Sequence, residues 1–195
     1  MFRRLALLCG VGLTLSGCGT TGLSALAVDG PDLHPSLVAL SVPELPLHVP
    51  HALLRSNPQH SADADFVAAV ARGGSQGGRL DAQGVQEALY AVYRDEDDVT
   101  IGVYGMETES ALEADRREAR LREIWAHNAL VDRTRVHRGG NVLAVVFCHP
   151  ATPAHWDAVN DFIAERIGAP EQPAGAATAA TVAGPTRPHA ESETD

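Results

Sequence analysis

The residue types best suited to chemistry gather toward the C-terminal end of this sequence. Cys148 and His149 are adjacent, and His155, Asp157 and Asp161 follow shortly after them. Thiolate, imidazole and carboxylate groups are the ligands that Zn²⁺ takes in proteins. A thiol within reach of an imidazole can also act as a nucleophile. One hypothesis is therefore a metal- or thiol-dependent enzyme centred on Cys148, His149 and His155.

The same stretch also has a plainer interpretation, which we prefer. The separation between His149 and His155 does not match a usual zinc-ligand spacing, and prolines lie between them. Cys148 ends the apolar run 142–147, and a cysteine in that position is more often a small buried apolar residue than a reactive one. We therefore expect no metal and no other cofactor.

A small basic patch stands out on an otherwise acidic chain. Arg133, Arg135 and Arg138 fall within a short segment, and a strand there would present arginines on the face opposite Val136. Guanidinium groups could bind a carboxylate, a phosphate or the acidic surface of a partner. The interpretation we prefer is that these charges protect an edge strand from pairing with another chain.

The N-terminus has the organisation of a secretory signal. Arg3 and Arg4 are followed by the apolar run 5–15, and Ser16 and Gly17 supply small residues before Cys18. The apolar run is shorter than the ~20 residues that a membrane-spanning helix requires. We therefore expect residues 1–17 to be a signal peptide that is removed.

The four residues 15–18, Leu-Ser-Gly-Cys, resemble the lipobox of bacterial lipoproteins. The resemblance covers residues 1–18 only. It implies a diacylglyceryl group on the Cys18 sulfur and cleavage before Cys18. Two or three acyl chains anchor a protein firmly, since each buried CH₂ contributes about 0.8 kcal/mol. Gly19, in place of aspartate, implies sorting to the outer membrane, facing the periplasm, if the organism has two membranes.

Lipidation would leave Cys148 as the only free thiol, because Cys9 lies in the signal and Cys18 is modified. The formal charge is −10, and it becomes −12 without Arg3 and Arg4, since residues 1–17 contain no acidic residue. The chain contains no lysine, which excludes a lysine nucleophile or a P-loop. An acidic protein without a basic stripe is a poor nucleic-acid binder, and we expect no nucleic acid as a partner.

We expect four segments along the chain. After the signal, residues 18–61 form a lipidated N-terminus and a proline-rich tether, although apolar residues near 37–40 and 45–47 allow part of it to pack on the domain or a partner. Residues 62–168 form the folded domain. Residues 169–195 are rich in alanine, threonine and proline and are expected to be disordered.

Within the domain, hydrophobic periodicity and capping signals predict seven elements in the order α-α-β-α-β-β-α. This order predicts an α+β fold with a small sheet of about three strands covered by helices. The first expected helix is capped by Ser61 or Asp63 and runs through Arg72, and the others begin at 81, 110 and 152. The expected strands cover 99–104, 134–138 and 141–148.

Together these features predict an exported envelope lipoprotein with a small non-catalytic binding or scaffolding domain. Its expected partners are the membrane, through lipid on Cys18, and an envelope protein. A variant of the same hypothesis is an accessory subunit of a secretion or transport assembly. The metal- or thiol-dependent enzyme remains the alternative from a different class.

Overall fold

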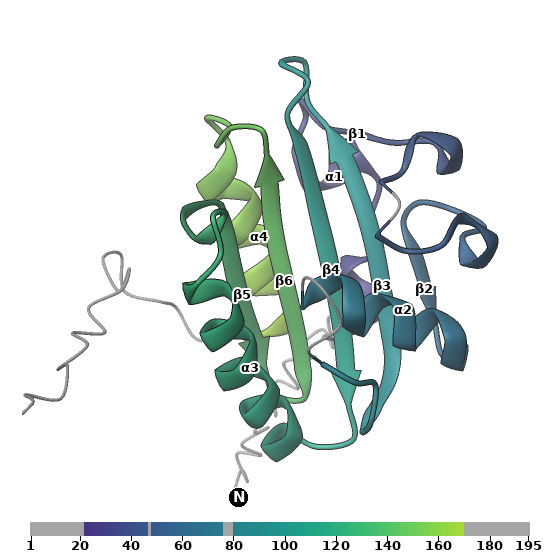
Figure 1. Cartoon of the computed structure of the whole chain (residues 1–195). Coiled ribbons are helices and arrows are strands. Elements are labelled where there is room, and N and C mark those ends of the chain that lie inside the picture. The colour runs from purple at the N-terminus through teal and green to yellow at the C-terminus, as the bar shows by residue number, and fades with distance from the viewer. Residues whose placement is uncertain (1–21, 47, 76–79, 170–195) are drawn as a thin grey trace, which may run out of the picture.

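The computed structural model of the chain describes residues 22–46, 48–75 and 80–169, and its centre is one antiparallel sheet (Figure 1). Two short strands pair with different parts of the outer edge of one long strand, and the long strands follow in the order β3-β4-β6-β5. The strands are β1 (Val38–Ala39), β2 (Gln59–Ser61), β3 (Val85–Arg94), β4 (Thr100–Thr108), β5 (Thr134–Gly139) and β6 (Val142–His149).

Helices cover both faces of this sheet, which gives three layers (Figure 1). Helices α2 (Ala64–Gly74) and α3 (Ala111–Ala126) pack on one face, which we call the α2/α3 face. Helix α4 (Trp156–Ile167), the short α1 (Gly30–Leu33) and the 3₁₀ helix η1 (Leu23–Leu26) pack on the other, the α4 face. Further 3₁₀ turns are η2 (Val42–Glu44), η3 (His51–Leu53) and η4 (Val131–Arg133).

Burial on both faces explains the composition of the central strands. All residues of 142–148 in β6 are buried, as are residues 88–93 in β3. A strand covered on one side only would alternate apolar and polar residues, whereas these strands are continuously apolar. The core is therefore split into two apolar layers, one on each side of the sheet.

The prediction of a sheet of about three strands was wrong: the sheet has six strands. The largest error was the helix predicted from Asp81, because residues 85–94 form β3, the strand that joins β1 and β2 to the rest of the sheet. The spacing of Val85, Leu89 and Val92 is compatible with a helix face. However, the run between them is apolar throughout because it is buried on both sides.

The other predicted elements of the domain are present. α2 begins after Asp63, whose carboxylate accepts hydrogen bonds from two backbone N–H groups of the first turn. α3 begins after Ser110, whose hydroxyl accepts from the Glu113 N–H. β5 and β6 form the predicted hairpin, with Gly140 at φ +59° in its turn. α4 begins at Trp156, later than the predicted start at 152, and ends at Gly168 as predicted.

The described part of the proline-rich stretch belongs to the domain rather than to a tether. Leu23 and Leu37 are fully buried on the α4 face. Between β1 and β2, the Asn57 side chain takes the place of a strand on β3: its amide oxygen accepts from the Val92 N–H at 2.9 Å, and its Nδ2 donates to the Val92 carbonyl. The packed domain therefore includes residues before the predicted boundary at 62.

Several predictions lie outside the described residues: the signal peptide 1–17, lipid on Cys18 and the tail beyond residue 169. Among the helices of the described segments, none combines the length and apolarity needed to cross a bilayer.

Candidate functional site

The residues of the enzyme hypothesis do not form one site. Cys148 and His149 are neighbours in β6 and therefore point to opposite faces of the sheet. Cys148 is fully buried in the α4 layer, and burial raises the pKa of its thiol. His149 is exposed on the α2/α3 side. Within the described ranges, no group of three or more histidine, cysteine or acidic side chains is arranged to hold a metal.

His155 instead belongs to a cluster with His34, Ser36 and Asp95 that sequence reasoning missed. Its ring stacks on His34, with centroids 4.5 Å apart. Ser36 Oγ lies 3.4 Å from His155 Nδ1, and Asp95 Oδ2 lies 3.8 Å from His155 Nε2. Burial, followed by the neighbouring His34, lowers the pKa of His155. Residues far apart in the sequence thus bring a hydroxyl, an imidazole and a carboxylate together.

The distances in this cluster do not fit a catalytic triad. A base that activates a serine is held by hydrogen bonds of about 2.6–3.2 Å on both sides. Here both contacts of His155 are longer, and the nearest partner of Ser36 Oγ is His34 Nδ1, at 2.7 Å. Asp95 uses its other carboxylate oxygen to accept the N–H groups of Asp97 and Val99 in the turn between β3 and β4. The contacts of His155 with His34 and Ser36 hold the 34–36 segment against the start of α4.

The predicted arginine patch lies along β5, at the end of the sheet order. Arg138 is paired with Glu118, with 2.7 Å between its Nε and the Glu118 Oε2, and the Arg133 guanidinium donates to the Pro150 carbonyl. Arg135 donates to the Thr134 carbonyl. Although burial raises the pKa of Glu118, the hydrogen bonds from Arg138 and Arg122 more than offset it and lower that pKa. These arginines are occupied by contacts within the domain.

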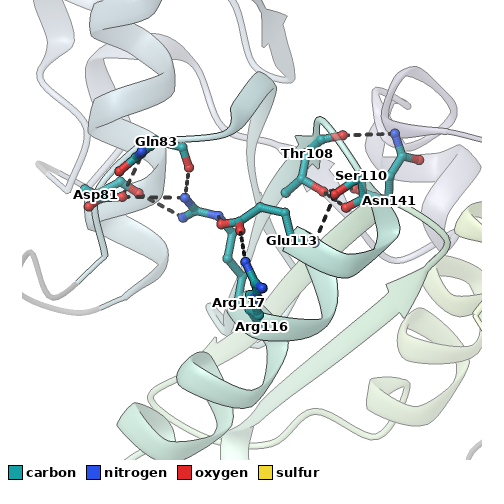
Figure 2. Close-up of polar contacts among 8 residues, drawn as sticks. All are labelled: Asp81, Gln83, Thr108, Ser110, Glu113, Arg116, Arg117 and Asn141. Atoms are coloured by element: carbon teal, nitrogen blue, oxygen red, sulfur yellow. Dashed lines mark hydrogen bonds and ion pairs between the residues drawn. The ribbon is translucent and has the colours of Figure 1, made fainter.

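A buried arginine, Arg117, connects α3 to the segment before β3 (Figure 2). Its side chain is only 5% exposed. The guanidinium donates to the carbonyls of Asp81, at 2.9 Å, and Gln83, and its Nε lies 2.9 Å from a Glu113 carboxylate oxygen. A polar hollow of about 430 Å³ lies over this network. Each of the three guanidinium nitrogens of Arg117 lies close to an oxygen of the domain, so we interpret the network as structural.

The feature best suited to function is a cavity of about 720 Å³ that opens on the α2/α3 face. It lies where the C-terminal ends of α2 and α3 meet the ends of β4 and β6. Such a volume is in the range of small-molecule sites in proteins. Its lining residues are Pro46, His48, Arg72, Gly73, Thr100, Tyr104, Trp125, Leu130, Phe147 and His149.

Aromatic rings form the floor of this cavity. The rings of Tyr104 and Phe147 stack with centroids 5.5 Å apart and 22° between their planes. Gly102 lies opposite Phe147 in the β4–β6 pairing, and a Cβ there would lie 2.1 Å from the Phe147 ring. Trp125 is buried, and its indole N–H donates to the Gly74 carbonyl at 3.1 Å. Glycine at position 102 therefore lets Phe147 lie flat beside the cavity.

The rim of the cavity is basic, in contrast to the acidic chain as a whole. Arg72 comes from the last turn of α2, and no described carboxylate lies within the 4.0 Å of an ion pair from its guanidinium. The imidazoles of His48 and His149 supply further hydrogen-bonding groups. Burial holds the pKa of Tyr104 well above its usual value, so this phenol stays neutral.

Sequence reasoning missed this cavity because its lining comes from segments scattered between residues 46 and 149. The sequence groups His149 with Cys148, whereas in the structure His149 lines the cavity together with Arg72. The one available signal was glycine inside a strand pattern, which marks a close approach of another group. Gly102 fits that signal. Comparison with protein families, characterised proteins and solved structures finds no match for this chain.

Proposed function

We propose that this protein is a lipid-anchored envelope protein whose domain binds a small apolar ligand in the cavity on the α2/α3 face, without catalysing a reaction. The observation that carries the proposal is the cavity itself, with Tyr104, Phe147 and Trp125 lining it. Apolar cavities with a few polar groups at the rim are the usual form of small-molecule sites. No carboxylate, thiol or serine hydroxyl is among the described lining residues, which supports binding rather than group transfer.

The position of Leu23 bears on how the domain would be held at a membrane. Leu23 is fully buried on the α4 face. Only residues 19–22 separate it from Cys18, and a chain of that length spans at most about 18 Å, at roughly 3.5 Å per residue. Lipid on Cys18 would therefore keep the domain next to the bilayer. The cavity opens on the opposite face of the sheet, so the anchor would not obstruct it.

The anchor is tested by replacing Cys18. We expect Cys18→Ala to release the protein from the membrane fraction or to leave an uncut precursor. The matched control is Cys9→Ala, which removes a thiol from the proposed signal and should leave membrane retention and processing unchanged. If Cys18→Ala is retained and processed like the natural chain, lipidation at Cys18 is excluded.

Binding in the cavity is tested with the neutral dye phenylnaphthylamine, whose fluorescence rises in apolar surroundings. Thr100 lines the cavity and is only partly buried. Thr100→Trp should fill the cavity and abolish the fluorescence rise, whereas Thr100→Val, of nearly the same volume, should keep it. A dye signal that is equal in both variants would place the binding elsewhere and contradict the proposal.

A further inference from the structure

We propose that the cavity selects an anionic aromatic molecule, one that carries a carboxylate or phosphate group on a planar ring system. This inference deepens the proposed function and rests on it. The anion would sit at the rim beside Arg72, and the rings would lie on the floor formed by Tyr104 and Phe147.

The preference for an aromatic body follows from the floor. Tyr104 and Phe147 already stack on each other, and aromatic rings gain from offset stacking beyond the apolar area that they bury. The indole N–H of Trp125 is used by the Gly74 carbonyl, so Trp125 offers the ligand only apolar surface. A planar ring system matches such walls better than a flexible chain, because it loses less conformational freedom on binding.

The preference for an anion follows from the rim. Arg72 lines the cavity, and among the described residues no carboxylate neutralises it. A guanidinium group binds carboxylate or phosphate through two parallel hydrogen bonds and also stacks on aromatic rings. His48 and His149 can add N–H donors. Among its described lining residues the cavity has an arginine and no acidic side chain, although the chain as a whole has a formal charge of −10.

The C-terminal end of α2, beside Arg72, repels an anion less strongly than the direction of the helix dipole suggests. The C-terminus of a helix carries partial negative charge on its unpaired carbonyls. At the end of α2, the carbonyl of Arg72 accepts from Ser75, and that of Gly74 accepts from Trp125. These carbonyls are already satisfied inside the protein.

The test compares two dyes that differ by one charged group. Anilinonaphthalenesulfonate is phenylnaphthylamine with an added sulfonate, which stands in for a carboxylate or phosphate. The protein is the chain from residue 18 onward with Cys18→Ser, which contains every described residue and carries no lipid. Dissociation constants for both dyes are measured with the natural Arg72 and with Arg72→Gln, and circular dichroism confirms that both proteins are folded.

We expect Arg72→Gln to weaken binding of the sulfonate dye about five- to ten-fold, the effect of losing one charge-assisted contact at a half-open rim. Binding of the neutral dye should change less than two-fold. If both dyes respond equally to Arg72→Gln, or neither does, the cavity binds without selecting an anion, and this inference fails while the proposed function stands. If neither dye binds, both fail.

A competition experiment tests the aromatic body separately. Naphthoate and octanoate carry the same carboxylate on a planar and on a flexible apolar body. We expect naphthoate to displace the sulfonate dye at a concentration several-fold lower than octanoate. Equal or better displacement by octanoate would overturn the aromatic preference and point to an alkyl acid.

Discussion

Gly102 controls the position of the Phe147 ring, and replacing it with alanine should both destabilise the domain and obstruct the cavity. An added Cβ would lie 2.1 Å from Cε1 and 2.2 Å from Cζ of Phe147, whereas ordinary contacts begin near 3.4 Å. The ring must therefore move by more than about 1 Å, since pairing with β3 and β6 holds the backbone of Gly102 on both sides. The cavity, which Phe147 lines, is the open space into which the ring can move.

Two opposing effects set the size of the loss. Overpacking a core typically costs about 1–3 kcal/mol. Replacing glycine with alanine also restricts the unfolded chain, which by itself stabilises a protein by about 0.4–1 kcal/mol. Because the ring can move into open space, we expect a net loss of about 1–2 kcal/mol in the free energy of unfolding. In a chain of this length that lowers the Tm by roughly 2–8 °C.

Urea denaturation measures the loss, and binding of phenylnaphthylamine measures the obstruction. Gly105→Ala is the matched control, because its Cβ would meet Leu23 at 2.3 Å on the α4 face. It should destabilise the domain by a similar amount and leave dye binding unchanged. Adding Phe147→Leu to Gly102→Ala should recover at least about 1 kcal/mol relative to the sum of the single effects. The reasoning is refuted if Gly102→Ala matches the natural chain in both stability and dye binding, or if Gly105→Ala impairs binding equally.

Three further predictions concern stability and reactivity. Arg117→Met should lower the free energy of unfolding by about 2–3 kcal/mol in urea denaturation, since it removes two charge-assisted hydrogen bonds to backbone carbonyls and the ion pair with Glu113. Arg116→Met, at a side chain 70% exposed, should change it by less than about 0.5 kcal/mol, and equal losses would contradict the structural role. Burial lowers the pKa of His137 despite its hydrogen bond to Asn160, so the folded state binds a proton at His137 less readily than the unfolded state does. The free energy of unfolding should therefore fall as the pH drops below about 6.5. His137→Gln should flatten this decline in thermal melts between pH values of about 7 and 5, and parallel curves for the two proteins would contradict the prediction. Cys148 should react with a thiol reagent only slowly until denaturant is added, because it is fully buried; fast reaction in the native state would show that the thiol is accessible.

The elements marked by local signals could be predicted from the sequence. Ser110 and Asp63 cap their helices through hydrogen bonds to residues two or three positions ahead, so the signal and the structure lie in the same few residues. The β5–β6 hairpin is similarly local, with Gly140 in its turn.

The size of the sheet could not be predicted in the same way. Residues 88–93 are apolar without a period because both faces of β3 are covered, and a run of this kind does not distinguish a strand from a buried helix. The Asn57 side chain is hydrogen-bonded to Val92 at the edge of β3, 35 positions further along the chain. No local sequence pattern predicts such a bond. The extra strands β1 and β2 depend on these long-range contacts.

The candidate site was the least predictable feature. No local sequence pattern links Arg72, Thr100 and Trp125. They line one cavity because the C-terminal ends of α2 and α3 lie beside the start of β4 and the end of β6. The grouping of Cys148 with His149 was misleading for a simple geometric reason: consecutive residues of a strand face opposite ways.

The two tryptophans offer the most direct test of the central claim that the cavity on the α2/α3 face is the binding site. Trp125 lines the cavity, and Trp156, the only other tryptophan, is buried on the α4 face. Each gives one indole N–H signal in a proton–nitrogen NMR spectrum, and Trp156→Phe assigns them. On adding anilinonaphthalenesulfonate, we predict that the Trp125 signal shifts while the Trp156 signal stays in place. A shift of Trp156 alone, or no shift of Trp125 at saturating dye, would contradict the account.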